Sequence, residues 1–270
     1  MTSPTLLAPH GPAVSGRSAP GRLGQMIAVA SGKGGVGKTW FSVTLAHALT
    51  RAGARVLLVD WDLGLANLDV QLGLAPQTDL ATVLRDRRPL ADAVLHHQVG
   101  FDILAGSSGT GAISALDAGG LAYMLTATRG LAEQYDYVIC DLAAGIDPTV
   151  RRMAAFADLL LVVVTDEPTS LTDAYAVLKL HRQDAPSPTR PARIVVNRAS
   201  SPSSGSRTYT TLARACQTFL GQTPALAGII RRDDRVADAI RRQTPFLGRH
   251  PTSAAAADVE AVARAVLQGG

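Results

Sequence analysis

The sequence predicts an α/β fold in which helices cover both faces of a mostly parallel sheet. Short apolar segments alternate with longer segments of helical periodicity from residue 26 to the end of the chain, which is the pattern of a parallel sheet with crossover helices. Hydrophobic residues make up 47% of the 270 residues but aromatic residues only 4%. The core is therefore built from Ala, Val and Leu, which suits helices packed closely on such a sheet.

The strands and helices are expected where apolar runs and helical spacing indicate them. The predicted strands are Met26–Ala30, Val56–Asp60, Phe101–Leu104, Tyr137–Asp141, Leu159–Val164, Arg193–Asn197 and Ala225–Ile230. The predicted helices are Lys38–Arg51, Leu80–Asp86, Ala115–Gln134, Pro148–Ala157, Thr172–Gln183, Tyr209–Leu220, Arg235–Gln243 and Ser253–Leu267. The stretch from Arg198 to Thr208 holds five serines and a proline, and is expected to be a surface loop.

One domain is predicted over residues 26–270, preceded by a tail over residues 1–25. The tail is rich in Pro, Gly, Ser and Ala and lacks the continuous apolar core of a signal peptide, so we expect it to be disordered. No apolar run approaches the ~18 residues of a membrane span. We therefore expect a cytoplasmic protein.

The cysteines and the net charge restrict the function only weakly. Cys140 and Cys216 lie far apart, without metal-ligand spacing. Cys140 ends a buried strand pattern, so we expect a core thiol. The net charge of +4 permits a weak attraction to nucleic acid or anionic lipid and establishes neither.

A glycine-rich octapeptide follows the first predicted strand and opens the first predicted helix. It is Gly32-Lys33-Gly34-Gly35-Val36-Gly37-Lys38-Thr39, which fits the P-loop pattern in full. Its glycines let successive amides point at phosphate oxygens. Lys38 is predicted to reach the β- and γ-phosphates, and Thr39 to bind Mg²⁺. The sequence therefore predicts a nucleotide site.

Lysine is rare in this chain. Of the 26 basic residues, only Lys33, Lys38 and Lys179 are lysines. Two of them lie in the octapeptide, which indicates that these positions need a compact ammonium group that a broad guanidinium cannot replace. An ordinary P-loop does not need a lysine directly after its first glycine, so Lys33 is expected to have a role of its own.

Two other predicted strands end in aspartate. Asp60 and Asp62 follow one apolar run, and Asp141 follows another. The carboxyl ends of parallel strands meet where such sheets bind ligands. We expect Asp62 to orient and polarise the attacking water, Asp60 to support the Mg²⁺ shell, and Asp141 to hold a water on Mg²⁺ from the Walker B position. The predicted metal site thus comprises Thr39, Asp60, Asp62 and Asp141.

Two more residues are expected at the nucleotide. Gly145 allows the backbone after Asp141 to approach the γ-phosphate. Asn197 ends a predicted strand, and its amide can both donate to and accept from the Watson–Crick edge of adenine.

Four stretches of the sequence resemble the FlhG/FleN family of MinD/ParA-type ATPases, together with the lysine-bearing P-loop. They are Asp62-Leu63-Gly64-Leu65-Ala66-Asn67-Leu68-Asp69, Asp141-Leu142-Ala143-Ala144-Gly145-Ile146, Glu167-Pro168-Thr169-Ser170-Leu171-Thr172-Asp173-Ala174-Tyr175-Ala176 and Ala239-Ile240-Arg241-Arg242-Gln243-Thr244-Pro245-Phe246. The resemblance implies a P-loop NTPase fold, ATP and ADP with Mg²⁺ as ligands, and slow, partner-modulated ATP hydrolysis. It also implies a homodimer when ATP is bound, in which Lys33 reaches the partner's nucleotide.

The resemblance further implies that Ile230 and Arg231 line the base pocket, and that the protein regulates flagellar number and placement. Its implied partners are an FlhF-like GTPase, flagellar C-ring proteins or a flagellar transcription regulator, at the inner membrane or the cell pole. The chain departs from the family at Trp40, a bulky residue beside the α-phosphate, and at Arg231, which replaces a proline. It also lacks the family's N-terminal Asp-Gln-Ala-x-x-Leu-Arg motif and C-terminal amphipathic tail, so FlhF stimulation and membrane contact stay open.

Two alternatives remain. A ParA-type partition ATPase would bind DNA nonspecifically through the arginines from Arg231 to Arg249. Aspartates interleave with those arginines, so we do not expect DNA as a partner. A weakly hydrolysing scaffold is the other alternative, because the bulk of Trp40 can alter nucleotide affinity.

Overall fold

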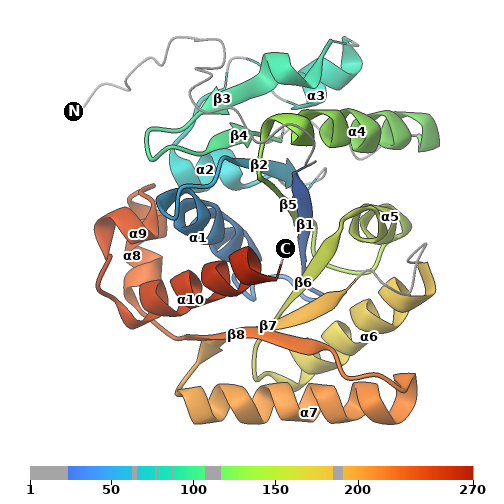
Figure 1. Ribbon diagram of the computed structural model, residues 1–270, viewed down its shortest axis with the longest axis vertical. Coiled ribbons are helices and arrows are strands. Elements are labelled where there is room, and N and C mark those ends of the chain that lie inside the picture. The colour runs from blue at the N-terminus through green and yellow to red at the C-terminus, as the bar shows by residue number, and fades with distance from the viewer. Residues whose placement is uncertain are drawn as a thin grey trace.

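The described residues of the computed structural model form an eight-stranded sheet covered by helices (Figure 1). They are residues 24–62, 66–76, 78, 80–86, 88–106, 117–184 and 191–269. The strands are β1 (Gln25–Ala30), β2 (Val56–Trp61), β3 (Val94–His96), β4 (Asp102–Leu104), β5 (Tyr137–Leu142), β6 (Leu159–Val164), β7 (Ala192–Ala199) and β8 (Ala225–Arg231). The α-helices are α1 (Lys38–Arg51), α2 (Leu68–Leu72), α3 (Leu80–Arg85), α4 (Ala118–Leu131), α5 (Pro148–Phe156), α6 (Pro168–Asp184), α7 (Pro202–Leu220), α8 (Arg235–Arg241), α9 (Phe246–Arg249) and α10 (Ala254–Gln268). Single 3₁₀ turns lie at η1 (Leu90–Ala93) and η2 (Ala132–Gln134).

The strand order places β1, which leads into the glycine loop, in the interior of the sheet. The order is β3-β4-β2-β5-β1-β6-β7-β8, and all neighbours are parallel except β3 and β4. β1 lies between β5 and β6. Asp60 on β2 pairs in register with Asp141 on β5. Two acidic strand ends therefore lie side by side next to the glycine loop.

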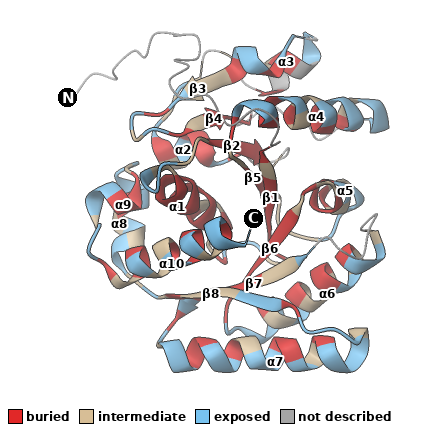
Figure 2. Cartoon of the chain, viewed as in Figure 1, coloured by how far each residue is buried: buried red, intermediate tan, exposed pale blue. Residues whose placement is uncertain are grey.

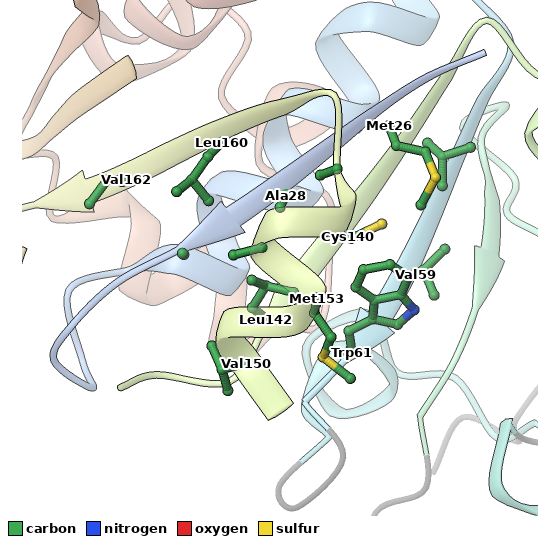
Figure 3. Close-up of a cluster of buried hydrophobic side chains, with 14 of the residues drawn as sticks. Met26, Ala28, Val59, Trp61, Cys140, Leu142, Val150, Met153, Leu160 and Val162 are labelled. Carbon is green, nitrogen blue, oxygen red and sulfur yellow. The ribbon is translucent and has the colours of Figure 1, made fainter. Parts of the chain in front are cut away.

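Successive residues of each inner strand supply two separate cores, one on each face of the sheet. In β1, Met26 and Ala28 belong to one core, and Ile27 and Val29 to the other. The first core lies beneath α4, α5, α6 and α7, and the second beneath α1, α2, α8, α9 and α10 (Figures 1 and 2). Figure 3 shows part of the first core, where Trp61 from β2 lies beside Met153 from α5. The predicted mostly parallel sheet with helices on both faces is confirmed.

The predicted elements are present in the described residues, and α1 and β6 begin and end where the sequence indicated. The predicted helix over 115–134 is divided between α4 and η2, and its residues 115 and 116 lie outside the described part. The last helix, α10, buries Val259, Val262, Ala263 and Val266 in the chain's own core, as expected.

The predicted loop from Arg198 to Thr208 is wrong over most of its length, because α7 begins at Pro202. Ser201 caps the helix and accepts a hydrogen bond from the amide of Ser204 at 3.1 Å, and proline is favoured at the first helical position. Ser206 donates its hydroxyl back to the carbonyl of Pro202 at 3.0 Å. The serines therefore cap this helix and hydrogen-bond to its backbone, although their abundance suggested a loop.

Four short elements escaped the sequence patterns: α2, η1, β3 and α9. Each has five residues or fewer, which is too short for a period to be recognised. Residues 1–23 lie outside the described part, so disorder of the tail stays a prediction, and Gln25 already begins β1. No helix of the described ranges combines the length and hydrophobicity needed to cross a membrane.

Candidate functional site

The glycine loop borders a cavity of about 880 Å³ at the carboxyl edge of the sheet. Gly34, Gly35, Gly37, Lys38 and Thr39 all line it. Gly37 has a left-handed backbone (φ 90), and a Cβ there would lie 2.5 Å from the Nδ2 of Asn197. The loop therefore needs glycine at this position both for its conformation and for its close approach to β7. Gly32, Lys33 and Val36 belong to the same loop but do not line the cavity.

Lys38 forms a buried ion pair beneath the loop. Its Nζ lies 3.0 Å from Oδ1 of Asp141, and the hydroxyl of Ser42 donates to the same oxygen at 3.0 Å. Only 8% of the Lys38 side chain and 2% of the Asp141 side chain are exposed. The pair joins the start of α1 to the end of β5 and places an ammonium group where a phosphate chain would enter the cavity.

Asp60 fixes the chain that follows β2. One carboxylate oxygen accepts the amide of Asp62 at 3.0 Å, and the other accepts the amides of Asn67 at 3.0 Å and Leu68 at 3.2 Å. Burial, followed by the charge of Asp141, raises the pKa of Asp60 to about 7, although the three amides pull it down. Asp62 and Asn67 themselves line the cavity. The buried Asp60 thus holds Asp62 at the cavity through the backbone amide of Asp62.

Lys33 is turned toward α6 of its own chain. Its ammonium donates to the carboxylate of Glu167 and, at 3.1 Å, to the hydroxyl of Thr169. The hydrogen bond from Lys33, and then its charge, lowers the pKa of Glu167. The sequence had singled out the Glu167 stretch without relating it to Lys33, and no local signal joins residues 134 positions apart.

The three residues predicted for base recognition lie outside the lining of the cavity. Asn197 is buried, donates to the carbonyl of Val36 at 2.8 Å and accepts the amide of Arg198 at 2.9 Å. Ile230 is fully buried, and Arg231 is bonded to Asp258 at 2.7 Å. None of these three lines the cavity, whereas Arg198 does. Base recognition by Asn197, Ile230 and Arg231 therefore stays a prediction.

Both tryptophans of the chain line the cavity. Trp40 packs edge-on against Phe246, with ring centroids 5.3 Å apart. Trp61 was not predicted as a site residue, although its place between Asp60 and Asp62 was a usable signal. Gly145 does not line the cavity, but its amide donates to the carbonyl of Ser31 at 2.9 Å and so joins the loop after β5 to the start of the glycine loop.

The residues at the cavity suit Mg²⁺ bound together with phosphate. Thr39 and Asp62 offer hard oxygen atoms, and Asp141 lies directly behind Lys38. In the described ranges, no three His, Cys, Asp or Glu side chains are grouped to hold a metal on their own. Such a sparse set fits Mg²⁺, which keeps several waters and takes one or two protein ligands plus phosphates.

Comparison with known proteins agrees with this geometry. Residues 27–246 match the CobQ/CobB/MinD/ParA nucleotide binding domain. The antiactivator FleN of Pseudomonas aeruginosa is 40% identical over 242 residues, which cover 90% of this chain and 86% of FleN. The flagellum site-determining protein YlxH of Helicobacter pylori is 29% identical over 193 residues, or 72% of this chain and 64% of YlxH.

Solved MinD structures share the fold. MinD of Pyrococcus horikoshii, complexed with Mg-ADP, superposes with a TM-score of 0.76 at 24% identity, covering 91% of this chain and 97% of MinD. MinD in the MinC:MinD complex of Aquifex aeolicus gives a TM-score of 0.72 at 27% identity, covering 91% and 96%. The protein is a MinD-type nucleotide-binding ATPase, and the chain belongs to the FlhG/FleN family of the MinD/ParA ATPases.

Proposed function

We propose that this protein is an ATP-dependent dimeric switch that regulates flagellar number and placement. The observation that carries the proposal is the different placement of two lysines from one loop. Lys38 lines the cavity, whereas Lys33 lies outside it and bonds to Glu167 and Thr169. A lysine that does not serve its own cavity can serve the cavity of a second copy once its contact with Glu167 breaks.

The site divides the chemistry of ATP hydrolysis among five groups. The glycine-loop amides and Lys38 would bind the phosphates, and the hydroxyl of Thr39 would hold Mg²⁺. Asp141 would support a water on that ion. Asp62, fixed through Asp60, orients and polarises the attacking water. Bound Mg²⁺ supplies charge neutralisation at the phosphates.

In the proposed switch, Lys33 moves from a contact within its own chain to the nucleotide of a second copy. In the single chain its ammonium is held by Glu167 and Thr169. In the ATP-bound dimer it crosses to the nucleotide of the second copy, and hydrolysis releases it. A dimer and a monomer regulate differently only if their partners bind the two states with different affinities, so the ATP-bound dimer is the form that engages flagellar proteins.

The flagellar role is supported by the relatives, since FleN is named as an antiactivator and YlxH as a flagellum site-determining protein. An affinity pull-down from lysate of the source cells tests it, with Asp62→Ala protein in ATP as bait and wild-type protein in ADP as the comparison. Enrichment of an FlhF-like GTPase, a C-ring protein or a flagellar transcription regulator by the ATP-bound bait supports the role. Enrichment of DNA or a centromere-binding protein replaces it with partition.

The described arginines near the C-terminus do not favour DNA binding. Arg235 is paired with Asp233 at 2.8 Å, and Arg242 and Arg249 are both paired with Asp238, at 3.0 Å and 2.9 Å. DNA binding by phosphate neutralisation requires cations that release counterions from DNA, and each of these cations is already paired with a carboxylate, although Arg242 and Arg249 share that of Asp238. A scaffold without turnover is tested by phosphate release from purified protein with its partners added.

A further inference from the structure

The segment from Ala239 to Phe246 bridges the two sides of the nucleotide cavity. It comprises the end of α8, the turn after it and the first residue of α9. Ile240 from this segment lines the cavity and is 36% exposed. On one side the segment contacts α1 through Phe246, and on the other it contacts α2 through Gln243. The proposed chemistry does not use either contact.

Gln243, which contacts α2, has an unusual backbone conformation. It has a left-handed φ of 52°, which it shares among the described non-glycine residues only with Arg198. Its side-chain Nε2 donates to the carbonyl of Val70 on α2 at 2.8 Å. Gly73, which ends α2, leaves room for this side chain, because a Cβ there would lie 3.1 Å from Oε1 of Gln243. A strained residue beside a functional cavity persists only where its surroundings hold it.

The other end of the segment is anchored in the core. Phe246 is 2% exposed and contacts Trp40, which is in the first turn of α1. Phe246, Trp40 and the buried leucines of α2, Leu68 and Leu72, all belong to the same hydrophobic core. Gln243 therefore joins α2 to a fixed part of the molecule.

α2 in turn determines the position of one wall of the cavity. Asn67 and Gln71 line that wall. The amides of Asn67 and Leu68 bond to the same Asp60 carboxylate that holds the amide of Asp62. A shift of α2 therefore alters both the wall and the support of Asp62.

We propose that Gln243 is a positioning residue for ATP hydrolysis: by holding the Val70 carbonyl it keeps α2, and through Asp60 the water-orienting Asp62, in place. The proposal deepens the proposed function and rests on it. Gln243 does not line the cavity, so its loss is expected to affect turnover more than nucleotide binding.

The test compares two changes at Gln243 with a change at its neighbour. Gln243→Gly removes the side chain and suits the left-handed backbone, so folding is retained. Gln243→Glu keeps the shape but replaces the donor with an acceptor that repels the Val70 carbonyl. Arg242→Ala is the matched control, since 59% of the Arg242 side chain is exposed, it pairs with Asp238, and it does not line the cavity. The kcat and KM for ATP are measured, together with hydrogen exchange of residues 66–74 without nucleotide.

Both Gln243 variants are expected to lower kcat about fivefold, the change that loss of one ordinary hydrogen bond produces, with KM within about twofold of wild type. Exchange is expected to accelerate over residues 66–74 and not in the core strands, while Arg242→Ala behaves as wild type. The proposal is overturned if Gln243→Gly shows the kcat and the hydrogen exchange of the wild type. It is also overturned if hydrogen exchange is faster throughout the chain. If the wild-type protein hydrolyses no ATP, the proposed function fails, and exchange over residues 66–74 alone decides whether Gln243 positions α2.

Discussion

The ammonium of Lys33 bonds to the carboxylate of Glu167, a residue 134 positions later in the same chain. Glu167 directly precedes α6, and Thr169 from the first turn of that helix supplies a second acceptor for Lys33. The contact lies outside the cavity that Lys38 lines. Lys33 therefore has a defined resting position in the single chain, and reaching a second copy requires that this contact break.

Lys33→Ala is expected to abolish ATP turnover while leaving the ADP affinity of the single chain within about threefold of wild type, because Lys33 does not line its own cavity. Lys38→Ala is expected to weaken ADP binding about a hundredfold, since it removes charge-assisted bonds to phosphate. Titration calorimetry with ADP and a phosphate-release assay measure the two effects. Lys179→Ala, at the remaining lysine of the chain, is the control. An equal loss of ADP affinity in Lys33→Ala and Lys38→Ala would contradict the division of roles.

Asp62→Ala is expected to lower kcat by about 10²- to 10⁴-fold, the usual contribution of a positioned acid–base group. Nucleotide binding persists, because Lys38 and the glycine loop remain. Steady-state hydrolysis and ADP titration separate the two effects. Asp234→Ala serves as a matched control, since its side chain is 90% exposed and lies 3.4 Å from the neighbouring Arg232. Undiminished turnover in Asp62→Ala would refute its role.

Asp60→Asn is expected to destabilise the fold by about 1–3 kcal/mol, the cost of leaving a buried polar group unsatisfied. Asp60 accepts three backbone amides through its two oxygens, and an asparagine turns one of those oxygens into a donor. Urea unfolding measures the change. Asp92→Asn, at an exposed carboxylate paired with Arg88, should change the unfolding free energy by less than about 0.5 kcal/mol. Equal stabilities of the two variants would show that the Asp60 network is not structural.

Acid is expected to destabilise the protein through His47, whose ring is buried on α1 beside Phe101. Burial, then the charges of Arg51 and His97, lowers the pKa of His47 from 6.5 to about 4. The unfolded chain therefore binds a proton between pH 6.5 and about 4 that the folded chain does not, and stability falls as the pH falls through that window.

The comparison that isolates this effect is His47→Leu, which removes the titrating group. Urea unfolding at pH 7 and pH 4.5 gives the difference between variant and wild type at each pH. That difference should shift by about 2 kcal/mol in favour of the variant at the lower pH. A difference that stays constant with pH would mean that His47 titrates normally in the folded protein.

Much of the fold was predictable because its signals are local. The apolar runs of β1, β2, β5 and β6 and the glycine loop are each continuous in sequence. The sheet rule then places Asp60 and Asp141 at the same edge, and their register confirms it. α7 was misjudged at its start because a serine cluster is typical of loops, whereas here Ser201 caps the helix and later hydroxyls bond back to its carbonyls.

The candidate site was only partly predictable, because several of its contacts join distant segments. Lys33 with Glu167 and Gln243 with Val70 are separated by 134 and 173 residues. Neither pair has a spacing that a helix or strand period could reveal. The cavity also includes Trp61 and Arg198, which only the packing of β2 and the irregular end of β7 bring to it.

Mass measurement of the Asp62→Ala protein by light scattering tests the dimeric switch most directly. With Mg-ATP, which this variant hydrolyses too slowly to consume, the account predicts twice the single-chain mass of 28.1 kDa. With Mg-ADP, or with Lys33→Ala added to the variant, it predicts the single-chain mass. The same mass in ATP and ADP, or a dimer that forms without Lys33, would contradict the account.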